Sequence, residues 1–349
     1  MGPKVEAACR FTEATGNVAA IGALRFASDP RWQSGHDYRG FGIEWGGPNV
    51  TSLTHDRFAS LNLILERKIC DLVFCDPPTK RWEASGVLVK DGHYFVVFDN
   101  RTEIARVADD LLPNDTNGLL GMVQAKYGFE GITYNGAKQR FYLLVEARKH
   151  AKGAYKALIV ECDHDFKYVK DRPVNFPFES RNKGFEAIVH LRRNSKDYLL
   201  ALCEGNKCKR GAKGRKPGGG RVLLFEKKKK CWLHVGTIAL PRSLPFVDYS
   251  GMSIDNGRVT IVSQVSSMLW VGNLNEADWT WRDEGQLYEF PRSKNGEIQY
   301  GNIEGVGWIT PTRVVTVSDR REKKRVSRTQ RFRKKINRST SLKFPRSPS

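Results

Sequence analysis

One short phrase recurs in this sequence with a glutamate at its head, followed by Gly or Ala and then an aliphatic residue. Its three copies are EGITYNGAKQRFYLLVEAR from Glu130, EAIVHLRRNSKDYLLALCEGN from Glu186 and EGVGWITPTRVVTVSDR from Glu304. The apolar run in each copy leads to a second acid, at Glu146, Glu204 and Asp319. Gathered carboxylates repel each other unless a cation neutralises them or some remain protonated. Because hard divalent cations prefer oxygen ligands, the phrase is a candidate for cation binding.

Two further segments follow the same pattern with serine at the head. They are SGVLVKDGHYFVVFDN from Ser85, which leads to Asp99, and SGMSIDNGRVTIVSQ from Ser250, which leads to Gln264. The five copies start 45 to 64 residues apart, close to the ~40–50 residues typical of propeller blades. The spacing therefore indicates one structural unit repeated five times.

The residues within and between the copies favour strands. Asp91-Gly92, Asn135-Gly136 and Asn256-Gly257 lie between two apolar runs, where a tight hairpin needs residues that tolerate positive φ. Further strands are expected at 157–162, 221–226, 232–240 and 268–274. Sandwiches do not repeat at this period, and β-helix coils are much shorter. The sequence predicts an all-β fold, a β-propeller of five or six blades.

A propeller would bring the acids together. The first strand of every blade lines the central channel, so the heads of the five copies should converge there. The second strand is antiparallel to it, so the second acids return to the same mouth. We expect Glu130, Glu186 and Glu304 to hold Ca²⁺ or Mg²⁺, while Glu146, Glu204 or Asp319 orients an attacking water. In the alternative interpretation the acids tie blades together through backbone N–H groups, Arg148, Arg320 or Lys126.

The ends of the chain are harder to assign to blades. Residues 1–60 fit no copy and are expected to be a lead-in or a degenerate blade, 61–320 the propeller and 321–349 a disordered basic tail. The stretch DLVFC at 71–75 resembles a strand that could complete the last blade.

The net charge of +20 is concentrated in two segments. Residues 205–230 hold 11 Lys/Arg against Glu226, and residues 319–349 hold 13 against Asp319 and Glu322. Such clusters attract nucleic acid without sequence specificity, although few aromatic residues for base stacking accompany them. We expect the first segment to be a flexible basic insertion and nucleic acid to be a less favoured partner than a small molecule or a protein.

Several classes of protein are disfavoured. No apolar stretch has the ~20 residues of a membrane helix, and the start MGPKVEAACRF lacks an apolar signal segment, so a cytoplasmic or nuclear protein is expected, or an extracellular one if a leader is missing. The seven cysteines contain no C-x-x-C pair, and most are expected to be buried thiols. Serine-nucleophile, zinc-protease and P-loop motifs are absent.

The E-G-I/V phrases resemble those of phytase-like or esterase-like β-propellers and of the SdiA-regulated proteins. In related propellers a channel glutamate of this phrase often binds a divalent metal, which implies that role for Glu130, Glu186 and Glu304. Copy three departs from the phrase with Ala187, and two copies begin with serine. The resemblance implies a divalent-cation-dependent ester or phosphoester hydrolase; the alternative is a noncatalytic propeller that binds a protein or, less favoured, a nucleic acid.

Overall fold

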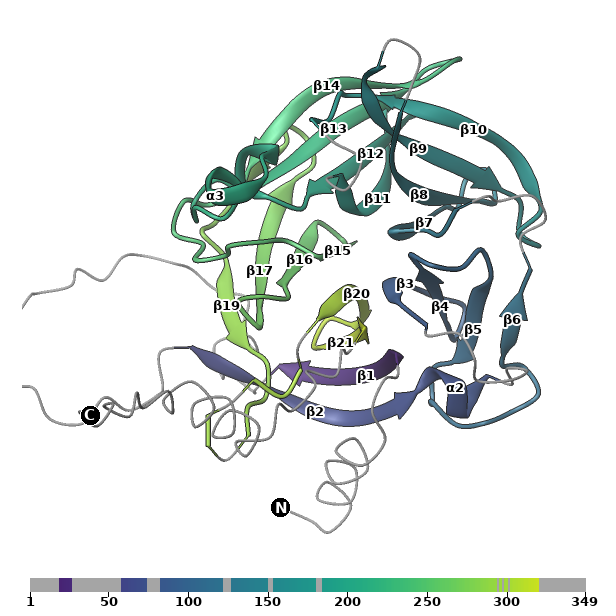
Figure 1. Ribbon diagram of the computed structural model, residues 1–349, viewed down its shortest axis with the longest axis vertical. Coiled ribbons are helices and arrows are strands. Elements are labelled where there is room, and N and C mark those ends of the chain that lie inside the picture. Colours follow the sequence, from purple (N-terminus) through teal and green to yellow (C-terminus); the bar gives the residue numbers. More distant parts are fainter. Residues whose placement is uncertain are drawn as a thin grey trace, which may run out of the picture.

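Antiparallel four-stranded units, here called blades, are arranged in a ring around one axis in the computed structural model (Figure 1). Short parallel pairings between outer strands join neighbouring units, so that the chain forms a 9-stranded, an 8-stranded and a 4-stranded sheet. The structure describes residues 19–26, 58–73, 82–121, 127–149, 153–179, 184–293, 295–296, 298–300 and 302–319. In that part of the chain the helices are limited to α2 (Ile69–Leu72), η3 (Asn206–Cys208) and α3 (Gly211–Gly214). None of these has the length or the apolar character needed to span a bilayer.

The first four blades follow the chain in order. The first consists of β3 (Ala84–Lys90), β4 (His93–Phe98), β5 (Ile104–Ala108) and β6 (Gly118–Leu120). The second consists of β7 (Gly131–Asn135), β8 (Arg140–Lys149), β9 (Tyr155–Cys162) and β10 (Tyr168–Asn175). The third consists of β11 (Phe185–Arg193), β12 (Lys196–Cys203), β13 (Arg221–Lys227) and β14 (Trp232–Ala239). The fourth consists of β15 (Gly251–Asp255), β16 (Arg258–Ser263), β17 (Met268–Asn275) and β19 (Gln286–Glu289), with β18 (Thr280–Trp281) beside β17.

The last blade combines both ends of the described chain. Its inner strands are β20 (Ile303–Thr310) and β21 (Arg313–Asp319), and its outer strands are β1 (Ala19–Phe26) and β2 (Ala59–Lys68). Strand β1 runs antiparallel to β21 from Ala19 opposite Asp319 to Arg25 opposite Arg313. The prediction of a closing strand at 71–75 was wrong for its described residues, because Ile69–Leu72 forms helix α2 and β1 and β2 complete the blade instead; residues 74–75 lie outside the described part of the chain. The basic tail at 321–349 lies outside the described residues.

The inner strands β3, β7, β11, β15 and β20 surround the axis, and each contacts the next to close the ring (Figure 1). The second residue of every copy is small because these strands approach closely there. A Cβ at Gly305 would lie 2.8 Å from the Gly86 Cα, and one at Gly131 would lie 3.3 Å from the Ala187 Cα. The all-β propeller is confirmed, and the Gly or Ala of the phrase has a packing role at its centre.

Apolar side chains between neighbouring blades form the core. Phe141 and Phe166 stack at 4.1 Å between ring centroids, and Phe95 of the first blade packs on both. Between the third and fourth blades, Leu224 and the fully buried Trp270 belong to one apolar cluster. Burial on both faces of each sheet explains why a single blade would not be stable by itself.

The hairpin prediction held for two of its three dipeptides. Asp91-Gly92 and Asn256-Gly257 have positive φ at both residues, as the tight mirror-image turn requires. Asn135 instead begins a longer loop in which Gln139 has the positive φ, 52°. Asn194 and Ser195 form a further turn of the tight kind, although the sequence there lacks glycine.

The basic insertion predicted at 205–230 is folded, with residues 205–220 anchored to the third blade and Arg221–Lys227 forming β13, which corrects the expectation of a flexible loop. Asn206 is fully buried, and its amide donates to the carbonyls of Gly214 at 2.9 Å and Phe246 at 3.1 Å. A disulfide joins Cys203 to Cys208. Of the other described cysteines only Cys162 is a buried thiol, so the expectation for the cysteines was also wrong. The insertion is held at both its start and its middle.

This anchoring predicts slow tryptic cleavage of the insertion despite its exposed lysines and arginines. Proteases need locally extended, mobile backbone, and the disulfide and Asn206 both restrict 205–214. Trypsin followed by mass spectrometry should show cleavage at Lys207–Lys216 accelerating at least several-fold after reduction, and likewise in a Cys208→Ser variant. Equal cleavage rates in the oxidised and reduced protein would contradict the anchored insertion.

Candidate functional site

Acidic side chains from the first, second, third and last blades, and the neutral Gln264 from the fourth, line one cavity on the axis, here called the funnel. Its volume is about 560 Å³. The acids that line it are Glu83, Asp99, Glu130, Glu146, Glu186, Glu204, Glu304 and Asp319, together with Ser85, Gln264 and Arg148 among other residues. All six candidate residues predicted from the sequence therefore face the same space. Ser250, expected beside them, is not among the residues that line the funnel.

The glutamates reach the funnel because each stands at the start of an inner strand. Glu130 directly precedes β7, and Glu186 and Glu304 are the second residues of β11 and β20. The Glu130 N–H donates to the Leu144 carbonyl at 2.9 Å, which holds the head of the phrase to the second strand of the same blade. This bond fixes the position of Glu130, and all three glutamates line the same cavity.

The second acids lie at the ends of the neighbouring strands. Glu146 lies within β8, Glu204 directly follows β12, and Asp319 ends β21. The Asp319 N–H donates to the Asn302 carbonyl at 3.0 Å, and the Glu204 N–H donates to the Gly184 carbonyl at 3.4 Å. Since these bonds join the end of the second strand to the approach of the first, both sets of acids open on one mouth.

The two serine heads have a different position from the glutamates. Both hydroxyls are buried and donate to backbone carbonyls that precede a glutamate in the next blade. Ser250 donates to the Ile303 carbonyl at 2.6 Å, and Ser85 donates to the Phe129 carbonyl. The serines thus link blades beside Glu304 and Glu130, and they offer the funnel no charge.

Sequence reasoning did not select two of the funnel's charged residues. Glu83 stands two positions before Ser85 and outside the phrase. The first blade therefore has an acid near the start of its inner strand, although serine heads its copy of the phrase. Arg148 follows Glu146 by two residues in β8, and it was considered only as a partner for the acids. Glu146 and Arg148 both line the funnel, although the pairing of β8 with β9 shifts register between Val145 and Arg148. Their two-residue spacing, typical of one face of a strand, is the signal that could have found Arg148.

Burial dominates the electrostatics of the funnel. It raises the pKa of Glu130 to about 8, and the carboxylate of Asp99 acts in the same direction. The pKa values of Glu186 and Glu304 are well above the ordinary value, first because of burial and then because of the Glu130 charge. Partial burial and a hydrogen bond with Glu83 raise the pKa of Asp99 to about 7. Near neutral pH these carboxyls hold protons that a cation could displace.

The side chains of the three head glutamates are available to bind a ligand. Within the described part of the chain, no side-chain hydrogen bond or ion pair is formed by Glu130, Glu186 or Glu304. Arg148, the expected basic partner, forms no ion pair with a described residue either. Arg320 and Lys126, named in the same interpretation, lie outside the described residues.

The spacing of the acids bears on which cation could fit. Among the described residues, only Asp163, His164 and Asp165 bring three ligand atoms within 4.8 Å of one another. No three funnel acids among the described residues meet that spacing, so a cation there would keep some of its water, as Mg²⁺ commonly does. The cavity is large enough for a hydrated ion.

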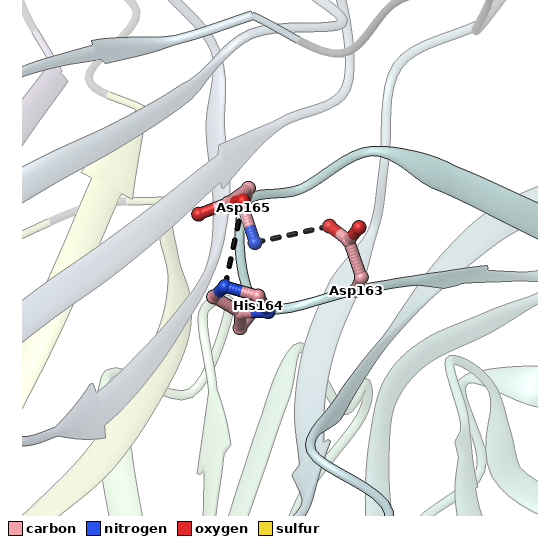
Figure 2. Close-up of side chains that lie close together, drawn as sticks. All are labelled: Asp163, His164 and Asp165. Carbon is pink, nitrogen blue, oxygen red and sulfur yellow. Dashed lines mark hydrogen bonds and ion pairs between the residues drawn. The ribbon is translucent and has the colours of Figure 1, made fainter.

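The Asp163–Asp165 turn is an exposed structural feature (Figure 2). The Asp163 carboxylate accepts the backbone N–H of Asp165 at 3.0 Å and that of Lys167 at 2.9 Å. His164 lies 3.4 Å from the Asp165 carboxylate in a surface pair. These bonds use the Asp163 oxygen to shape the turn between β9 and β10, and His164 is an exposed histidine beside it.

No protein-family model and no curated protein matches this sequence. Among solved structures, the chain is similar to the glutaminyl cyclase of Myxococcus xanthus, with a TM-score of 0.41 and 14% identity over 68% of this chain and 90% of that one. It is also similar to the Dos1 propeller (TM-score 0.38, 8% identity, 73% and 59% covered) and to the PQQ-bound aldose sugar dehydrogenase of Streptomyces coelicolor (0.36, 11%, 69% and 95%). These likenesses concern the fold and say nothing of the chemistry.

Proposed function

We propose that the funnel binds a divalent cation, Ca²⁺ or Mg²⁺, and that the protein is a cation-dependent hydrolase of an ester or phosphoester. The observation that carries the proposal is the imbalance of charge around one cavity: eight carboxylates line it, and Arg148 is the one basic side chain among its described lining residues. Such an arrangement needs positive charge or bound protons to be stable. The resemblance to phytase-like and esterase-like propellers supports the same reaction class.

The chain's residues divide into two roles in this proposal. Glu130, Glu186 and Glu304 would hold the cation, directly or through water, from three inner strands. When bound, the cation would polarise an ester or phosphoester oxygen. Glu146, Glu204 and Asp319 lie on the strands beside them and would accept a hydrogen bond from the attacking water and orient it. The closed ring of strands keeps the two sets at a constant separation.

Thermal unfolding tests cation binding directly. A cation that binds only the folded protein stabilises it by mass action, about 2.7 kcal/mol at a hundred times its Kd. We expect Ca²⁺ or Mg²⁺ to raise the Tm by several degrees and the Glu130→Gln/Glu304→Gln double variant to lose that shift. The matched control is Glu179→Gln, which removes an exposed glutamate paired with Lys209 and should keep the shift. A wild-type Tm that is equal in chelator and in 5–10 mM cation would contradict the proposal.

Hydrolysis itself is tested with chromogenic substrates, p-nitrophenyl acetate and p-nitrophenyl phosphate. Activity that chelator abolishes, that added cation restores and that Glu204→Gln lowers by at least about tenfold would support the assigned roles. Cation binding without any hydrolysis in a broader ester panel would favour the noncatalytic propeller, which would then bind its partner through the same cation-loaded mouth.

A further inference from the structure

The guanidinium of Arg148 is held in place by an aromatic ring. Its Cζ lies 3.7 Å from the centroid of the Tyr127 ring, the distance of a cation stacked on a π face. Tyr127 lies on the segment that leads to Glu130, and Arg148 lies near the end of β8 in the same blade. Stacking leaves the edge of the planar guanidinium, which carries the N–H donors, free to face another group.

Among the described residues, no acid pairs with those donors, although acids surround them. Arg148 lines the funnel beside eight carboxylates, yet no ion pair joins it to any described residue. Its Nε is buried and meets no acceptor in the described part of the chain. A buried donor without an acceptor is unfavourable, and a guanidinium in an acidic cavity would ordinarily satisfy it by pairing. Here the guanidinium stacks on Tyr127 instead, although its charge still opposes the rise in the pKa of Glu130.

We propose that Arg148 is the anchor for an oxyanion on the ligand of the funnel, a phosphate or carboxylate group bound by the fork of its N–H donors. The planar fork matches two oxygens of such a group, and bound oxygens would satisfy the buried Nε. The inference rests on the proposed function in one respect, because the cation would neutralise the carboxylates that otherwise repel an anion. It makes the preferred substrate an anionic ester, a phosphoester before a neutral ester.

Two variants separate the charge of Arg148 from its shape. Isothermal titration with inorganic phosphate, on the full chain in the presence of Mg²⁺, should show binding to the wild type. Arg148→Gln should weaken it by about 10- to 100-fold, as expected for losing hydrogen bonds to a charged group. Arg148→Lys keeps the charge without the fork and should be intermediate. Tyr127→Leu should also weaken phosphate binding, because the guanidinium can then turn toward the acids.

A matched control is available on another blade. Arg258 also stacks on an aromatic ring, with its Cζ 4.7 Å from the Trp308 centroid, but it is not among the residues that line the funnel. Arg258→Gln should leave phosphate affinity unchanged. Acetate replaces phosphate in a parallel titration, and tighter binding of acetate would identify the anchored group as a carboxylate.

The outcomes distinguish this inference from the proposed function. Loss of phosphate binding in Arg148→Gln with an intact Mg²⁺-induced Tm shift supports the anchor. If the wild type binds phosphate without any response to Mg²⁺ and Arg148→Gln abolishes that binding, the anchor stands and the cation does not. Equal phosphate and acetate affinity in the wild type and Arg148→Gln, or binding of neither anion by the wild type, overturns the anchor while leaving cation binding by Glu130 and Glu304 unaffected.

Discussion

In the absence of divalent cations, the protein is expected to lose thermal stability as the pH rises from about 5 to about 8. Burial raises the pKa of Glu130 from 4.5 to about 8 and that of Asp99 to about 7, and it raises the pKa values of Glu186 and Glu304 well above 4.5. The folded protein therefore binds protons that the unfolded chain has already released. The stability that these protons provide is complete below the unfolded pKa and is lost as the pH passes the folded pKa.

The expected size of this effect is large. Each proton held only by the folded state changes the free energy of unfolding by about 1.4 kcal/mol per pH unit. One such proton between pH 5.5 and 7.5 amounts to about 3 kcal/mol, or a Tm lower by several degrees for a domain of this size. Bound cation takes the place of the protons, so added Ca²⁺ or Mg²⁺ should flatten the dependence.

Differential scanning calorimetry across this pH range, with and without chelator, measures the slope. Glu130→Gln removes a titrating group and should make the curve in chelator shallower. The exposed Glu179, whose pKa is lowered by its hydrogen bond with Lys209, provides the control, and Glu179→Gln should leave the slope unchanged. Stability that rises with pH in the presence of chelator would show that the funnel acids are ionised in the folded protein.

Substitution of Gly305 by alanine is expected to destabilise the propeller more than alanine at other positions of the ring. The added Cβ would lie 2.8 Å from the Gly86 Cα and 2.8 Å from the Val317 Cγ2, which is closer than such atoms approach in folded proteins. Backbone at the axis cannot move without displacing the neighbouring inner strand. We expect a loss of about 1–3 kcal/mol, the range of overpacked cores.

The other glycines of the phrase have more space, so the expected loss of stability on substitution by alanine decreases from one position to the next. A Cβ at Gly86 would meet the Gly131 Cα at 3.1 Å, and a Cβ at Gly131 would meet the Ala187 Cα at 3.3 Å. Gly86→Ala and Gly131→Ala should therefore cost progressively less than Gly305→Ala. At Gly118, in the outer strand β6, a Cβ would meet nothing within 4 Å, so Gly118→Ala should change stability by less than about 0.5 kcal/mol. Urea denaturation of the four variants would refute the packing account if Gly118→Ala cost as much as Gly305→Ala.

The convergence of the acids could be predicted because repetition carries three-dimensional information. Each head residue begins an inner strand, and inner strands of a propeller start at one level, so Glu130, Glu186 and Glu304 meet although they are far apart in sequence. The same reasoning placed the second acids, since an antiparallel strand returns to its starting side. In both cases a local strand pattern, repeated around one axis, determines where the residue lies.

The closure of the ring could not be predicted in the same way. Strands β1 and β2 are outer strands and lack the phrase, so nothing in the repeat identifies them. The alternation of Leu61, Leu63 and Leu65 in β2 was the available signal, but it does not specify which blade the strand joins. That choice depends on pairing between Ala19–Phe26 and β21, a contact across nearly the whole chain.

The remaining features of the site depend on contacts between side chains. The stack of Arg148 on Tyr127 joins residues with no periodic relation, and the Cys203–Cys208 bridge has none of the spacings that mark a familiar cysteine motif. Asn206 anchors the basic insertion through carbonyls as distant as that of Phe246. The composition of this insertion, rich in Lys, Arg and Gly, predicted a flexible loop. One buried residue, Asn206, fixes it, and a single residue does not alter the overall composition.

Proton release on cation binding tests the central claim of a proton-loaded, cation-binding funnel most directly. Titration calorimetry with Ca²⁺ or Mg²⁺ at pH 7, repeated in two buffers of different ionisation enthalpy, counts the protons that leave as the cation binds. We predict binding with release of at least one proton in the wild type, and neither binding nor release in Glu130→Gln/Glu304→Gln. Absence of binding in the wild type, or binding without proton release that the double variant retains, would contradict the claim.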